Sequence, residues 1–154
     1  MRQASARCEH PPKEERSPVM ETLPSRRRIL VIDHNDDVRE ILCGHLSAIG
    51  FDASAEADGA SGLSRLASDQ AIRPFHGVLV ELEMPALGGL AVLRELRERF
   101  PSVPVIIMSD ALHVTKLRQA MTAGAKEYLV KPFDSGLLRH KCMNVFLDGK
   151  DQAM

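Results

Sequence analysis

Short apolar runs alternate with amphipathic stretches over most of the chain, and this pattern predicts its secondary structure. Residues 29–32 (Ile-Leu-Val-Ile) are continuously apolar and mostly β-branched, which is typical of a strand buried on both faces. In the next stretch, apolar residues recur at helical spacing from Val38 to Ile49. Asn35 precedes this stretch as an expected N-cap and Gly50 follows it as a terminator, so the first unit is a strand and a helix.

The same alternation repeats four more times toward the C-terminus. It predicts further strands at 51–55, 77–81, 103–108 and 127–130. It predicts further helices at 59–68, 90–99, 112–123 and from 134 or 135 to 147. Five strand–helix units predict an α/β fold, a doubly wound parallel sheet with helices on both faces. Because crossovers are right-handed, the flavodoxin-like strand order 2-1-3-4-5 suits five units.

The two ends of the chain differ from this alternating region. Residues 1–27 are rich in Pro, Arg, Glu and Ser and show no apolar period, so we expect a disordered N-terminal leader. We expect the folded domain at 28–147 and a flexible tail at 148–154. No helix-turn-helix pattern or basic recognition helix is present, which predicts a stand-alone domain that does not bind DNA.

Composition narrows the setting further. The 154 residues carry a net charge of −1, which gives no broad attraction to nucleic acid or to a membrane. No apolar stretch approaches the roughly 20 residues that span a bilayer. The three cysteines, Cys8, Cys43 and Cys142, fit neither a disulfide framework nor a zinc pattern. We therefore expect a cytoplasmic protein.

Chemistry-bearing residues follow four of the predicted strands. In doubly wound sheets the working site lies at the carboxyl ends of the strands. The residues at these ends are Asp33 and His34, Glu81, Ser109 and Asp110, and Lys131 and Pro132. The sequence therefore predicts that carboxylates, a hydroxyl group and an ammonium group converge in one pocket.

Two segments resemble the response regulator receiver domain, the CheY-like family of bacterial two-component signalling. Residues 75–85 are similar to the family's acceptor segment, and Met84-Pro85 fixes a register that puts Glu81 at the phosphoacceptor position. Residues 123–133 are similar to the segment that carries the family's lysine and switch aromatic, which places them at Lys131 and Tyr128.

The resemblance covers residues 28 to about 147 and extends to the other functional positions. Asp33 and His34 match the acidic pair, and Ser109 matches the switch Ser or Thr. The resemblance implies the receiver fold and a cis peptide bond before Pro132. It also implies that a working pocket holds Mg²⁺ and accepts a phosphoryl group from a histidine kinase.

Glu81 departs from the family, which keeps aspartate at the acceptor position. The extra methylene moves the carboxylate outward by about 1.5 Å. Small misplacements of a reacting group can cost on the order of 10²-fold in rate. The longer side chain can instead reach Lys131 and partly imitate a phosphorylated aspartate, although a carboxylate carries less charge than a phosphate. The alternative is that Glu81 is merely tolerated in an inactive pocket.

His34 is the second departure, because it replaces one carboxylate of the acidic pair. Mg²⁺ prefers oxygen ligands, so we expect weak or absent Mg²⁺ binding and no other cofactor. Asp33, Glu81 and Glu83 remain weak metal candidates, which together with His34 favour a transition metal, although a fortuitous cluster explains them better. Asp110 follows the switch serine and would oppose an incoming phosphoryl group.

These departures favour a binding function over a catalytic one. No pair of nucleophile and base stands out, so we do not expect an enzyme. We expect an atypical, phosphorylation-independent receiver that acts by protein–protein interaction. The contact face would be the fourth helix, fifth strand and last helix, and the partner a histidine kinase or a second copy.

Two other functions remain open at this stage. One is an ordinary phosphorelay receiver that accepts phosphate on Glu81 or a nearby acid. The other is a flavodoxin-like domain that binds a small molecule. The acids at 33–37 and the lack of a Gly-rich loop argue against a phosphate-bearing ligand there.

Overall fold

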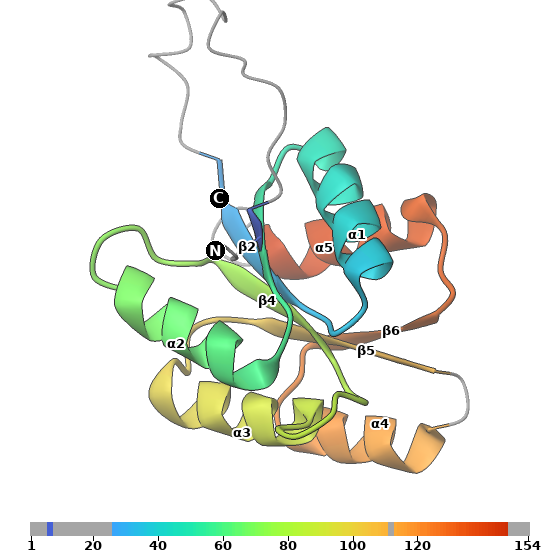
Figure 1. Ribbon diagram of the computed structural model, residues 1–154. Helices are drawn as coiled ribbons and strands as arrows, with labels where there is room; N and C mark the ends of the chain where they lie inside the picture. Colours follow the sequence, from blue (N-terminus) through green and yellow to red (C-terminus); the bar gives the residue numbers. More distant parts are fainter. Residues whose placement is uncertain (1–5, 8–25, 111–112, 148–154) are drawn as a thin grey trace, which may run out of the picture.

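The computed structural model describes residues 6–7, 26–110 and 113–147, and its centre is a six-stranded sheet with the order β1-β3-β2-β4-β5-β6 (Figure 1). The strands are β1 Ala6–Arg7, β2 Arg28–Ile32, β3 Asp52–Glu56, β4 Gly77–Glu81, β5 Val105–Asp110 and β6 Glu127–Lys131. The strands from β2 onward are all parallel. Counted from β2, their order is 2-1-3-4-5, which confirms the predicted fold class.

Strand β1 was not predicted, because two residues cannot show an alternating pattern. It pairs antiparallel with β3 at the edge of the sheet. It lies inside the segment 1–27 that was expected to be a leader without regular structure. Most of that segment, and the expected tail at 148–154, lie outside the described residues.

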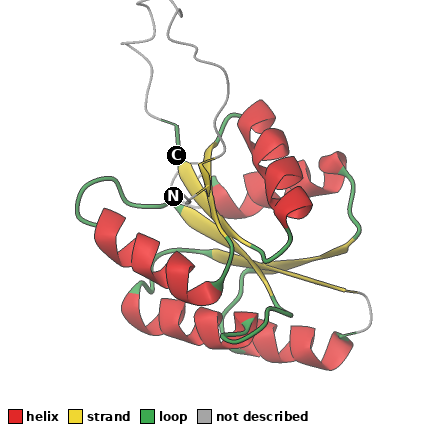
Figure 2. Cartoon of the chain, viewed as in Figure 1, coloured by secondary structure: helices red, strands yellow, loops and turns green. Residues whose placement is uncertain are grey.

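In the described part of the chain, five helices cover both faces of the sheet. They are α1 Asp36–Ile49, α2 Gly59–Asp69, α3 Gly89–Arg99, α4 Val114–Thr122 and α5 Ser135–Phe146. Helices α1 and α5 lie on one face, and α2, α3 and α4 lie on the other (Figures 1 and 2). This is the two-faced arrangement that the sequence predicts.

The buried core is divided by the sheet into two apolar layers. Along β2, Leu30 and Ile32 face the layer under α2, α3 and α4, whereas Ile29 and Val31 face the layer under α1 and α5. All four side chains have no exposed surface. Successive residues of a strand point to opposite faces, so a strand buried on both faces is apolar throughout.

Element ends differ from the prediction near β5 and α4, and the differences matter for the site. The strand expected at 103–108 begins only at Val105, because Pro104 has no N–H group to donate to the sheet. It continues to Asp110, so Ser109 belongs to the strand itself. Helix α4 begins at Val114, two residues later than expected, and His113 is its N-cap residue.

Local interactions fix the loops that carry the site. The Asn35 side chain accepts a hydrogen bond of 3.0 Å from the N–H group of Val38 and caps α1. The bond between Lys131 and Pro132 is cis, as the resemblance implies. At Gly89 a Cβ atom would lie 2.2 Å from the Glu81 carbonyl oxygen, so only glycine lets α3 start this close to the end of β4.

The cysteines differ from the expectation that none is paired. Cys142 is a free thiol, and its complete burial raises its pKa to about 12. Cys43 on α1 is disulfide-bonded, so the expectation is wrong for this residue. Within the described ranges, no helix has the length and apolar character needed to cross a membrane.

Candidate functional site

Three of the predicted residues meet at the carboxyl edge of the sheet. Asp33 directly follows β2, Glu81 ends β4, and Lys131 ends β6. The Lys131 ammonium group donates to Asp33 Oδ2 at 2.9 Å and to Glu81 Oε2 at 3.2 Å. Segments 98 and 50 residues apart in the chain are thereby joined by one side chain.

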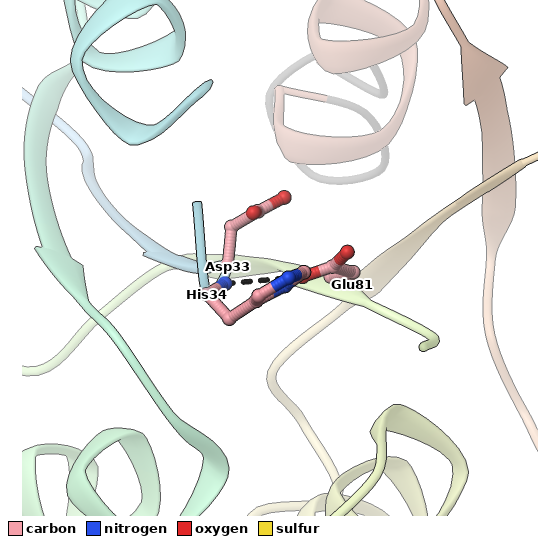
Figure 3. Close-up of side chains that lie close together, drawn as sticks. All are labelled: Asp33, His34 and Glu81. Carbon is pink, nitrogen blue, oxygen red and sulfur yellow. Dashed lines mark hydrogen bonds and ion pairs between the residues drawn. The ribbon is translucent and has the colours of Figure 1, made fainter. Parts of the chain in front are cut away.

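His34 holds the other side of the Glu81 carboxylate. Its backbone N–H group donates to Glu81 Oε1 at 3.0 Å, and its ring Nδ1 lies 2.6 Å from the same oxygen. Since a carboxylate only accepts, the ring nitrogen is the donor in this contact. Figure 3 shows the imidazole ring and the Glu81 carboxylate facing one another. We call Asp33, His34, Glu81 and Lys131 the acceptor pocket.

All four carboxylate oxygens of the acceptor pocket accept hydrogen bonds from protein groups. Asp33 Oδ1 accepts from the N–H group of Asn35 at 2.9 Å, and Lys131 binds its other oxygen. His34 and Lys131 divide the two oxygens of Glu81 between them. Asp33 is fully buried and Glu81 is 4% exposed, so these bonds are shielded from water.

The charges of the pocket shift one another's pKa values. Burial raises the pKa of Asp33, and the hydrogen bonds from Asn35 and Lys131 oppose this only in part. Burial acts in the same direction on Glu81, but the bonds from His34 and the charge of Lys131 outweigh it and lower its pKa. Burial would lower the pKa of Lys131, but the two carboxylates outweigh burial and raise it. Glu81 and Lys131 therefore both hold their charges firmly.

The side chains of the acceptor pocket are a poor set of ligands for the Mg²⁺ ion that the resemblance to receivers implies. Mg²⁺ requires several oxygen ligands in near-octahedral geometry and keeps part of its water shell. In this pocket the carboxylate oxygens already accept protein hydrogen bonds, and His34 brings a nitrogen where an oxygen would be needed. Asp33, His34 and Glu81 do lie close enough to share a cation, but Lys131 already provides one.

Ser109 is buried at the same edge but is not bonded to the acceptor pocket. Its hydroxyl group donates to Glu83 Oε2 and also contacts the carbonyl oxygen of Asp110 at 3.2 Å. Tyr128 lies on β6 and is 39% exposed. The Lys141 ammonium group lies 4.4 Å from the centre of its ring. Ser109 therefore lies at the predicted edge of the sheet, but it bonds to Glu83 and not to the acceptor pocket.

Glu83 belongs to a second group of side chains, which we call the rim cluster: Glu83, Asp110 and His113. His113 Nδ1 lies 3.0 Å from Glu83 Oε2. From the sequence, Glu83 was grouped with Asp33 and Glu81, and His113 was missed because it fell within the helix expected at 112–123. The short spacing from Asp110 at the end of β5 to His113 at the N-cap of α4 is the signal that would have indicated it.

Comparison with known proteins identifies the family of this fold. The model of the family described as "Response regulator receiver domain" matches residues 29–142. The chain is 38% identical over 106 residues to Response regulator MprA of Mycolicibacterium vanbaalenii, covering 69% of this chain and 44% of the relative. It is 34% identical to Regulatory protein AtoC of Escherichia coli, covering 70% of this chain and 22% of the relative. The chain thus spans less than half the length of these curated relatives.

Solved structures show the same fold. A receiver domain protein from Clostridium thermocellum superposes with a TM-score of 0.71 at 28% identity, covering 77% of this chain and 92% of that one. The chemotaxis protein CheY4 of Vibrio cholerae superposes with a TM-score of 0.70 at 23% identity, covering 79% and 99%. The family match spans most of the chain, and the chain belongs to the response regulator receiver domain family.

Proposed function

We propose that this receiver signals through protein contacts that do not depend on phosphorylation of the acceptor position. The observation that carries the proposal is the double hold on Glu81, by His34 on one oxygen and by Lys131 on the other. In a working receiver the acceptor oxygen must be free to attack phosphorus in line. Here both oxygens are engaged, and the side chain is 5% exposed.

The same contacts give Glu81 a part of what a phosphorylated acceptor does. The lysine of a receiver binds the new phosphate, and here Lys131 already binds Glu81 Oε2 at 3.2 Å. A carboxylate supplies one negative charge and two oxygens, whereas a phosphate supplies nearly two charges and three oxygens. Ser109, which would bind a further phosphate oxygen, donates to Glu83 instead. The imitation is therefore limited to the lysine contact.

Weak Mg²⁺ binding is part of the proposal. The imidazole of His34 stands where the family has a carboxylate, and Lys131 supplies the positive charge that Mg²⁺ would bring. Without the ion, transfer of a phosphoryl group to Glu81 lacks its main electrostatic support. We accordingly propose a binding role rather than an enzymatic one.

The proposed contact face consists of α4, β6 and α5. Four of the exposed large apolar side chains belong to these elements: Val114, Met121, Tyr128 and Leu137. Their exposed fractions range from 36% at Met121 to 59% at Val114. Exposed apolar side chains rimmed by charged ones are typical of protein interaction surfaces. The proposed partner is a histidine kinase or a second copy of this chain, and no nucleic acid or membrane is involved.

The cytoplasmic location is proposed from the family. Disulfides are rare in the cytoplasm, and Cys43 is disulfide-bonded in the structure. Alkylation of thiols in intact cells tests the location, since a cytoplasmic protein is expected to carry Cys43 in reduced form. Protection of Cys43 from alkylation in cells would argue for an oxidising compartment.

Phosphoryl labelling separates this function from that of an ordinary phosphorelay receiver. The chain is incubated with acetyl phosphate and Mg²⁺, and its intact mass is measured. We expect no increase of about 80 Da, the mass of one phosphoryl group. The matched control is the double variant His34→Asp with Glu81→Asp, which restores the family's pocket and should be labelled. A labelled Glu81 in the unmodified chain would support the phosphorelay function instead.

The contact face has its own test. Analytical ultracentrifugation measures self-association of the unmodified chain and of Leu137→Arg, with Ile72→Arg as the control. Ile72 is 81% exposed and lies in the loop between α2 and β4, far from the proposed face in sequence. A dimer that Leu137→Arg weakens and Ile72→Arg leaves intact supports a second copy as the partner. A monomer at high concentration excludes the second copy and leaves the kinase.

A further inference from the structure

The rim cluster brings three metal-ligating atoms around one point. One carboxylate oxygen from Glu83, one from Asp110 and one ring nitrogen from His113 all lie within 4.8 Å of one another. Nitrogen and oxygen ligands bind a transition metal at about 2.0–2.2 Å, which places neighbouring ligands about 3.0–3.5 Å apart. The separation of 3.0 Å between His113 Nδ1 and Glu83 Oε2 lies in this range.

Two separate segments hold these ligands in place. Glu83 lies in the loop after β4, and its Oε2 also accepts from the buried Ser109 hydroxyl group. Asp110 ends β5, and the N–H group of His113 donates to its carbonyl oxygen at 3.3 Å. This bond holds Asp110 and His113 near each other, and a ligand atom of each lies within 4.8 Å of one of Glu83. A cation here would join the loop after β4 to the start of α4.

Charge distinguishes the rim cluster from an ordinary ion-paired surface. Within the described part of the chain, no lysine or arginine forms an ion pair with Glu83 or Asp110. The two carboxylates therefore lack a compensating lysine or arginine among the described residues. His113 Nδ1 approaches Glu83 closely, yet the angle is not that of a hydrogen bond, and this buried nitrogen has no other partner among the described residues. A cation shared between the two atoms would stabilise this arrangement.

We propose that the rim cluster is a binding site for one divalent transition metal ion. Imidazole together with carboxylates suits Zn²⁺, Ni²⁺ or Fe²⁺, whereas Mg²⁺ and Ca²⁺ prefer oxygen alone. The site lies outside the acceptor pocket and does not depend on phosphorylation. Because His113 is the N-cap residue of α4, the ion would fix the start of a helix in the proposed contact face. The metal would thereby set the position of that face.

Isothermal titration with Zn²⁺ tests the site on the full chain. We expect one ion per chain. The affinity should be at least about 10-fold lower in His113→Ala, because losing even a group that only supports a metal ligand lowers metal affinity by about 10–100-fold. Glu83→Gln should weaken binding in the same direction. The matched controls are His34→Gln in the acceptor pocket and His140→Ala on α5, which should bind as the unmodified chain does. Circular dichroism establishes that each variant is folded.

Binding of Co²⁺ provides a second, spectroscopic measurement that does not rely on calorimetry. Its visible absorption reports the coordination geometry, and the spectrum of the bound ion should change in His113→Ala but not in His140→Ala. Absence of saturable Zn²⁺ binding would overturn the proposal. So would loss of binding in His34→Gln with retention in His113→Ala, which would move the ion into the acceptor pocket. Equal affinity in all four variants would also overturn it, because the ion would then bind elsewhere.

Discussion

The acceptor pocket and the rim cluster lie at the same edge of the sheet and contain similar groups, yet they differ in one respect. Each has two carboxylates and a histidine. Only the acceptor pocket also has a lysine, whose ammonium group bonds to both carboxylates. Lys131 therefore neutralises the first group from within, while the second retains its charge. The comparison indicates that a single basic side chain decides whether such a pair of carboxylates can bind a cation from solution.

The largest effect is expected from Lys131→Met, which removes the positive charge inside the acceptor pocket. Asp33 and Glu81 would then lie buried and close together without the ammonium group that they share. Removing one partner of a buried ion pair typically costs 3–5 kcal/mol, and because the Lys131 side chain is partly exposed we expect about 3 kcal/mol of lost stability. Denaturant unfolding at pH 7 measures this loss.

A lysine that makes no such bonds provides the control. Lys126 is exposed, and Lys126→Met should change the free energy of unfolding by less than about 0.5 kcal/mol. In Lys131→Met one buried carboxyl group should keep its proton to higher pH. The stability of this variant should then rise as the pH is lowered from 7 toward 5. Equal stability of the two variants would show that the internal ion pair contributes nothing.

A weaker change at the same pocket is Glu81→Gln, which keeps the shape but removes the charge. We expect a loss of about 1–3 kcal/mol at pH 7, because hydrogen bonds to a charged group are lost. The pKa of Glu81 is lowered in the folded protein, so its stabilisation is complete above the ordinary glutamate pKa of about 4.3 and disappears as the pH falls through the lower folded value. Unfolding curves of both proteins from pH 7 to pH 3 measure this difference.

The difference between the two proteins should thus be constant from pH 7 to about pH 5 and shrink below about pH 4. A difference that grows on acidification would contradict the assignment of a lowered pKa to Glu81.

The smallest effect is expected at the rim cluster. Glu83→Gln removes a charge that has no lysine or arginine partner among the described residues, and it keeps an oxygen that can accept from Ser109. Without added metal, we expect a change within about 0.5 kcal/mol, as for most surface substitutions. Thermal unfolding in the presence of a chelator measures it. A loss of stability as large as that expected for Glu81→Gln would show that a positively charged group of the protein also neutralises the rim cluster.

The sequence predicts the acceptor pocket better than the rim. Continuous apolar strands and right-handed crossovers determine which strand ends meet, so Asp33, Glu81 and Lys131 could be placed together before any coordinates. The position of Ser109 was also correct, but its partner was not predictable, because a hydroxyl group bonds to whichever acceptor its rotamer reaches. The register of Glu81 came from the family's motif and not from periodicity.

The rim cluster depends on features that a linear pattern does not contain. His113 reaches Glu83 only because α4 begins two residues later than its apolar spacing suggests. Helix ends are the least certain part of such assignments, since capping is decided by individual side chains. Strand β1 could not be predicted for a related reason. Its two residues take their conformation from pairing with β3 and not from a pattern of their own.

The close approach at Gly89 has a consequence for how variation in this chain is to be interpreted. Any side chain there would collide with the backbone at the end of β4, so the position tolerates glycine alone whatever the protein signals. In a library of random variants, selection for folding by itself would keep Gly89, whereas it would only disfavour changes at Glu81, where replacement by glutamine costs about 1–3 kcal/mol. If selection for signalling also kept Glu81, the two positions would appear equally invariant for different reasons. Comparing variants selected for folding with variants selected for signalling would distinguish these reasons.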